Sequence, residues 1–132
     1  MYWKDDMATG VEELDFKLKE LVTEINAVMR NITASRNPSI MVKRIQEIKD
    51  CCIEYFSYQE TMMIISNYPL YYQHKHSHEQ LIDKIDVVTN EYMASAYSFS
   101  TSQLENVINE WFVRHVFLDD KMFADFYKKR KG

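Results

Sequence analysis

Three short breaks divide the sequence into four segments, and each segment carries apolar residues at alternating steps of three and four. The breaks are Asn37-Pro38-Ser39, Asn67-Tyr68-Pro69 and the serine-rich stretch 98–102, which contain residues typical of helix ends. A spacing of three and four places the apolar side chains on one face of an α-helix. Four such helices with short connections predict an all-α, antiparallel up-down four-helix bundle.

The apolar face of each segment can be followed residue by residue. The first face consists of Val11, Leu14, Leu18, Leu21, Ile25, Val28 and Ile32. The second consists of Met41, Ile45, Ile48, Cys52, Tyr55, Gln59 and Met62. The third and fourth consist of His74, His78, Leu81, Ile85, Val88 and Tyr92, and of Leu104, Ile108, Trp111, His115, Leu118 and Met122. We expect these faces to form the core of a single domain, 1–132, with residues 1–10 as an irregular arm packed through Tyr2 and Trp3.

Composition supports long helices and excludes several functions. Glycine and proline occur only twice each, whereas a β-rich fold usually needs more turn residues. With 16 basic and 20 acidic residues the net charge is −4, which excludes a general nucleic-acid-binding surface. No apolar run approaches the roughly 18 residues that cross a membrane.

The cysteines and the chain start indicate a cytoplasmic protein. Cys51 and Cys52 are adjacent, and adjacent cysteines rarely pair with each other, so we expect two reduced thiols. No basic-then-apolar signal segment opens the sequence. No nucleophile arrangement and no glycine-rich phosphate loop is readable, so we expect a binding protein rather than an enzyme.

Five residues on the predicted inward faces are not ordinary core residues: Tyr55, Gln59, His74, His78 and His115. Burying an unpaired polar side chain costs about 1–3 kcal/mol, so several of them require a shared reason. One reason is a network of hydrogen-bonded core histidines.

The other reason is a metal ion. His74 and His78 lie four residues apart and direct two imidazoles from one helix to one point. His115 could add a third nitrogen from a facing helix, and Asp120 a carboxylate oxygen. Three nitrogens and one carboxylate suit zinc, iron or manganese.

The motifs around these residues resemble those of the hemerythrin family. Tyr68-Pro69 followed by His74 and His78 is similar to the family signature YPxxxxHxxxH, and the run 111–121 is similar to WLxxHIxxxDK. The run 9–15 resembles the opening TGVxxID, and the run 55–63 occupies the segment HFxxEExxM. The resemblance covers nearly the whole chain and implies the hemerythrin-like four-helix bundle.

The resemblance also implies a ligand set for metal. Hemerythrins hold two irons with five histidines and two bridging carboxylates. The positions of four ligands are retained here as His74, His78, His115 and Asp120. The remaining positions fall on Leu18, Tyr55 and Gln59. The family's ligands at the three retained histidines belong to one iron, whereas Leu18 and Tyr55 stand where the oxygen-binding iron has its terminal ligands.

The resemblance therefore implies a non-haem metal-binding protein with half of the family's site. We expect one iron ion rather than two, with zinc as a chemically suitable alternative, and we do not expect conventional reversible oxygen carriage. Tyr55, Gln59, Leu18 and Glu60 are expected to line the site. A small diatomic molecule is a possible ligand, and the protein partner stays open.

Two alternatives remain at this point. One is a metal-free helical bundle that acts as a structural or interaction domain. The other is a mononuclear iron site that reacts with oxygen, peroxide or nitric oxide, with Tyr55 near the open position.

Overall fold

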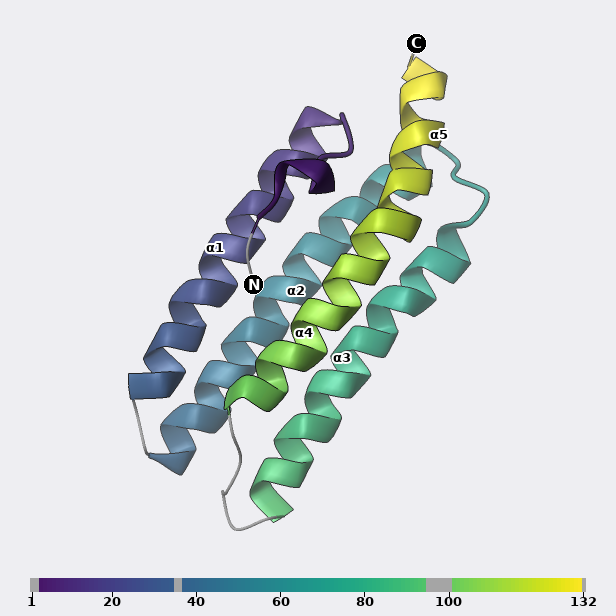
Figure 1. Ribbon diagram of the computed structural model, residues 1–132. Helices are drawn as coiled ribbons and strands as arrows, with labels where there is room; N and C mark the ends of the chain where they lie inside the picture. The colour runs from purple at the N-terminus through teal and green to yellow at the C-terminus, as the bar shows by residue number, and fades with distance from the viewer. Residues whose placement is uncertain (1–2, 35–36, 95–100, 132) are drawn as a thin grey trace.

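The chain folds into four antiparallel helical rods, seen in a computed structural model that describes residues 3–34, 37–94 and 101–131. The first three rods are α1 (Glu12–Ala34), α2 (Pro38–Ile65) and α3 (Tyr71–Ala94). The fourth is continuous and consists of α4 (Thr101–His115), the π-helical η2 (Val116–Asp120) and α5 (Lys121–Lys131). Figure 1 shows successive rods running in opposite directions, which confirms the predicted up-down bundle.

Two of the predicted breaks end or begin helices through specific backbone contacts. The side chain of Asn37 accepts hydrogen bonds from the amides of Ser39 and Ile40, and Pro38 occupies the first turn of α2. Asn67 has a φ of 58°, and the amides of Asn67 and Tyr68 donate to the carbonyls of Ile64 and Met63. This is a Schellman ending, in which a left-handed residue closes α2. The break at 98–102 lies mostly outside the described residues.

The N-terminal arm contains one short 3₁₀ helix, η1 (Asp5–Met7), and is held by several contacts. Trp3 packs against the core, as predicted, whereas Tyr2 lies outside the described residues. The Asp15 carboxylate accepts hydrogen bonds from the amide and hydroxyl of Thr9, each at 2.8 Å. Lys128 Nζ donates to the Thr9 carbonyl at 2.9 Å, and Lys121 Nζ to the Asp6 carbonyl at 2.8 Å. The arm is therefore anchored between α1 and α5.

Most residues of the predicted inward faces are buried, but at two positions the next residue along the helix is buried in place of the expected one. Met29 is 5% exposed and Met63 is fully buried, whereas Val28 and Met62 are only half-buried. Steps of three and four both keep a residue on the apolar face, and the contacts with neighbouring helices decide between them.

The fourth rod departs from the predicted face after His115. Leu118 and Met122, which were expected inside, are 55% and 51% exposed. The buried residues at this end are Val116, Asp120, Phe123 and Ala124. A π-helical turn contains one more residue than an α-turn, so every later side chain is displaced by one position around the rod. The inward face therefore continues through Asp120 rather than through Leu118.

Among the described residues, no helix combines the length and the apolar character needed to cross a lipid bilayer.

Candidate metal centre

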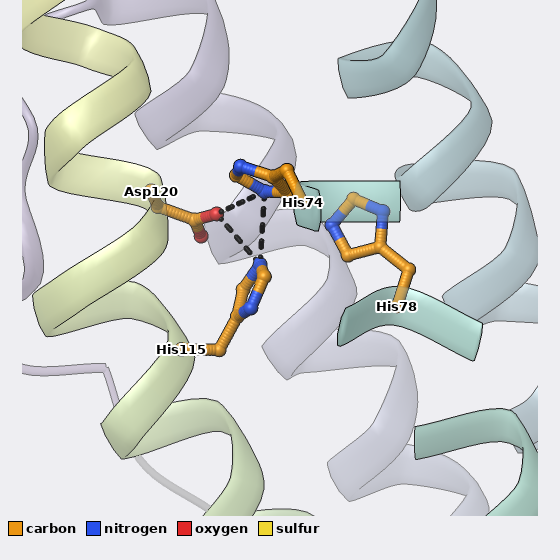
Figure 2. Close-up of side chains that lie close together, drawn as sticks. All are labelled: His74, His78, His115 and Asp120. Carbon is orange, nitrogen blue, oxygen red and sulfur yellow. Dashed lines mark hydrogen bonds and ion pairs between the residues drawn. The ribbon is translucent and has the colours of Figure 1, made fainter. Parts of the chain in front are cut away.

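Four potential ligands meet inside the bundle. His74 and His78 come from α3, His115 from the end of α4, and Asp120 from the end of η2. Each side chain offers one ligand atom, and these atoms all lie within 4.8 Å of one another. The four residues are between 1% and 3% exposed. Figure 2 shows the three imidazoles and the carboxylate directed toward a common point.

The separations of the ligand atoms match those around one metal ion. Asp120 Oδ1 lies 2.9 Å from His115 Nε2 and 3.1 Å from His74 Nε2, and the two nitrogens are 3.0 Å apart. Ligands that bind one ion at about 2.0–2.2 Å lie about 3–4.4 Å from one another. These three atoms are therefore spaced as in a single coordination sphere, and the whole cluster of four, within 4.8 Å, is only slightly wider.

The local helix geometry explains why these residues converge. His74 and His78 are four residues apart on an α-helix, which places their rings one above the other. His115 and Asp120 are five residues apart, which matches the repeat of the π-helical turn between them. Each pair is thus held by the backbone of one rod, and the packing of α3 against α4 brings the two pairs together.

Oxygen groups outside the cluster hold the rings of two of its histidines. Glu60 Oε2 lies 2.7 Å from His78 Nδ1. Asp119 Oδ2 and Ser77 Oγ lie 3.1 Å and 2.9 Å from His115 Nδ1. A carboxylate only accepts hydrogen bonds, so these Nδ1 atoms carry a proton. The Nε2 of His78 then presents its lone pair inward, and the Nε2 of His115 would do so after giving up its own proton to make room for a metal ion. The same arrangement orients histidine ligands in known metal sites.

Sequence reasoning recognised only part of this outer set. Glu60 was expected to line the site, and it does so through His78. Asp119 and Ser77 were missed. Asp119 stands four residues after His115, and this helical spacing could have identified it. Ser77 approaches His115 from another helix, and no spacing within the chain indicates that contact.

Aromatic rings cover two of the ligand imidazoles. Phe56 is stacked on His78 with ring centres 4.0 Å apart and planes 4° apart. Trp111 is stacked on His115 at 4.3 Å and 14°. These contacts and the outer hydrogen bonds together restrict each ring in position and in rotation.

The electrostatics differ between the histidines of the metal-free site. Burial, reinforced by the charges of His115 and His74, lowers the pKa of His78 to about 2. Burial also acts against protonation of His115, but the charge of Asp120 and hydrogen bonds to Asp119 and Asp120 raise its pKa to about 9. The pKa of Asp120 lies well below its ordinary range because the opposing His115 and His74 outweigh its burial. Without metal, the centre therefore contains a neutral His78 beside a charged His115–Asp120 pair.

Several buried polar atoms in the cluster have no protein partner. They include His78 Nε2 and Asp120 Oδ2. His78 Nδ1 donates to Glu60, so Nε2 of the same ring is a hydrogen-bond acceptor. This buried Nε2 receives no hydrogen bond from any protein group. Leaving such an atom unpaired costs about 1–3 kcal/mol, and a bound cation would remove that cost. The donor set and this orphaned nitrogen both fit one metal ion.

The residues at the other half of the implied site do not fit a second ion. Leu18 is 1% exposed and packs in the hydrophobic core. Tyr55 is 5% exposed in the same core, and its burial and the nearby charges of Asp120 and Asp15 raise its pKa well above 10. Among the described residues, Tyr55 forms no hydrogen bond with Gln59 or with the histidines. Gln59, in contrast, joins the cluster and contacts both His74 and Asp120.

The fold and the centre together define a helical bundle with a buried histidine–carboxylate cluster that could hold a metal ion. No family model matches the sequence. The bacteriohemerythrin of Pseudomonas paraeruginosa strain PA7 is 24% identical over 125 residues, which cover 95% of this chain and 80% of that protein. The bacteriohemerythrin of Stenotrophomonas maltophilia is 23% identical over the same lengths.

Solved structures of hemerythrin have a similar fold. The crystal structure of wild-type hemerythrin matches with a TM-score of 0.79 at 20% identity and covers 96% of this chain and 97% of that one. The crystal structure of a hemerythrin point mutant matches with a TM-score of 0.78, also at 20% identity, and covers 96% of each chain. The chain is thus similar in sequence to bacteriohemerythrins and has the fold of hemerythrin.

Proposed function

We propose that this protein is a hemerythrin relative that binds one metal ion through His74, His78, His115 and Asp120. The observation that carries the proposal is the convergence of four buried ligand atoms within 4.8 Å. The carboxylates of Glu60 and Asp119 support it, because they orient two of the ligand rings from outside. Iron is the ion that the family favours, and zinc also suits three imidazoles and a carboxylate.

The proposed site differs in chemistry from a two-iron centre. An iron ion would supply one-electron redox chemistry and a position for a small diatomic ligand. Conventional reversible oxygen carriage takes two electrons, one from each of two ferrous ions. Leu18 has no lone pair, and the apolar surroundings of Leu18 and Tyr55 disfavour a second dication. We therefore propose a metal-binding protein, without catalytic activity, rather than an oxygen carrier.

One observation favours a metal-free alternative. Gln59 contacts His74 at 2.9 Å and Asp120 at 3.0 Å, and Asp120 contacts His115. These contacts satisfy several buried polar groups without any metal. On this reading the bundle is a structural or interaction domain with a polar core network.

Metal content per chain separates the two functions. We expect elemental analysis of protein from iron-supplemented, air-exposed cells to find about one metal ion per chain. The variant His115→Ala should lose most of it. His76→Ala is the matched control, because His76 lies on the same helix as His74 but is exposed and outside the cluster.

The possible results lead to different conclusions. Wild-type protein without metal, even after reconstitution with ferrous or zinc ions, would favour the metal-free network. Full metal content in His115→Ala would contradict the proposed ligand set. Two ions per chain would mean that residues at the second half of the site contribute ligands.

A further inference from the structure

Gln59 is the only amide side chain that contacts the candidate ligands in the described part of the chain. It lies on α2, is fully buried and uses both ends of its side chain. Its Nε2 donates to Asp120 Oδ1 at 3.0 Å, and its Oε1 lies 2.9 Å from His74 Nε2. A neutral side chain thus connects the carboxylate ligand with one of the imidazole ligands.

The chemistry of Asp120 determines how the amide is oriented. Asp120 Oδ1 lies 3.0 Å from Gln59 Nε2, 2.9 Å from His115 Nε2 and 3.1 Å from His74 Nε2, and a carboxylate oxygen surrounded by nitrogens accepts hydrogen bonds. The NH₂ group of Gln59 must therefore face Asp120, and the carbonyl oxygen must face His74. This oxygen is then 2.9 Å from a ligand nitrogen, which is the separation expected between neighbouring ligands of one ion.

We propose that Gln59 is a fifth, neutral ligand of the metal ion, acting through Oε1. This inference rests on the proposed mononuclear site. A metal ion would replace the proton that His74 Nε2 shares with its neighbours, and the Gln59 oxygen would then face the ion instead of the proton. Amide carbonyl oxygens are established ligands of divalent cations. The Nε2–H group meanwhile holds the Asp120 carboxylate in position.

Gln59 is uncharged, and this affects which oxidation state of the bound metal ion the site prefers. Among the five ligands only Asp120 carries a negative charge. A carboxylate at position 59 would add a second one and would stabilise a trivalent ion more than a divalent ion. Gln59 therefore makes the site more selective for divalent ions than a glutamate at this position would.

Cobalt(II) is a suitable probe of the ligand number, because its visible absorption bands are several-fold stronger with four ligands than with five. We expect wild-type protein to bind one Co²⁺ per chain with the weak bands of a five-ligand site. Gln59→Leu removes the oxygen and should increase the band intensity several-fold at unchanged stoichiometry. Gln59→Asn keeps the amide but withdraws it by one methylene, and should shift the spectrum in the same direction.

The control is Gln103→Leu, which makes the same change at an exposed position of α4. Circular dichroism checks that each variant is folded before cobalt is added. If wild-type protein binds Co²⁺ and neither Gln59 variant changes the spectrum, the fifth ligand is refuted and the mononuclear site remains. If wild-type protein binds no Co²⁺, Zn²⁺ or Fe²⁺, both proposals fail.

A second measurement tests the effect of charge. In protein loaded with one iron per chain, Gln59→Glu should favour the ferric state at least tenfold over wild type. This corresponds to a reduction potential at least about 59 mV lower for a one-electron couple. An unchanged or higher potential would overturn the role of Gln59 in selecting the divalent state.

Discussion

His115 and Asp120 are five residues apart, yet His115 Nε2 lies 2.9 Å from Asp120 Oδ1. In a regular α-helix five residues turn by about 500°, which would leave the two side chains about 140° apart. The π-helical turn η2 between them removes most of this angle. The π-helical turn within the fourth rod therefore brings two of the candidate metal ligands together.

This geometry predicts how the site responds to changes in length. Deleting the exposed Leu118 would place Asp120 four residues after His115, where an α-helical turn leaves the side chains about 40° apart. We expect this deletion to retain metal and to keep Phe123 buried. Inserting one alanine between Phe117 and Leu118 should abolish metal binding, because Asp120 then rotates away. Metal content and circular dichroism of both variants would test this, and metal loss in the deletion variant would contradict it.

The outer carboxylate of Glu60 should contribute to metal affinity without binding the ion. Its Oε2 lies 2.7 Å from His78 Nδ1, so Glu60→Gln weakens the group that orients this ring. Loss of such an outer partner typically lowers affinity about 10- to 100-fold. Competition with a chromophoric zinc chelator would measure the change. Glu79→Gln is the control, because Glu79 is exposed on α3, and equal affinities for the two variants would refute the role of Glu60.

The metal-free protein should be most stable near pH 6.5. The pKa of His78 is about 2 when folded and 6.5 ordinarily, so below pH 6.5 the unfolded chain alone takes up this proton. The pKa of His115 is about 9 when folded, so its contribution is complete below pH 6.5 and is lost as the pH rises toward 9. Each histidine changes the free energy of unfolding by at most about 1.4 kcal/mol per pH unit.

Urea denaturation of chelator-treated protein across pH 4–9 would measure this profile. The variant His115→Ala should lack the decline above pH 6.5 and keep the decline below it. A wild-type stability that rises steadily to pH 9 would show that His115 is not held in its charged form.

The side of the centre that contains Leu18 and Tyr55 should bind a second metal ion when metal-binding residues are introduced there. We expect the combined variant Leu18→His, Tyr55→His and Gln59→Glu to bind about two metal ions per chain. Burying the new polar groups costs about 1–3 kcal/mol each without metal, so metal should raise the melting temperature more than in wild type. The same variant with Leu18 unchanged is the control. If the full variant bound only one ion per chain, the residues at positions 18, 55 and 59 would not be sufficient to explain the absence of a second ion.

Much of this protein was predictable from the order of its residues. The apolar steps of three and four define the helices, Asn37-Pro38 and Asn67 mark two of their ends, and the i, i+4 pair His74 and His78 indicates a shared target. These features depend on local helix geometry, so spacing along the chain is sufficient to find them. The resemblance in motifs implied the same fold and added the family's ligand positions that fall on Leu18, Tyr55 and Gln59.

Other features depended on how the rods pack. A regular α-helix would have buried Leu118 and turned Asp120 away, and only the structure shows the π-turn that exposes the first and buries the second. The contacts of Gln59 with Asp120, of Ser77 with His115 and of Glu60 with His78 each join different rods. Local spacing determined which residues share one helix face, whereas the packing of helices distant in sequence decided which of those faces meet and where their polar groups pair.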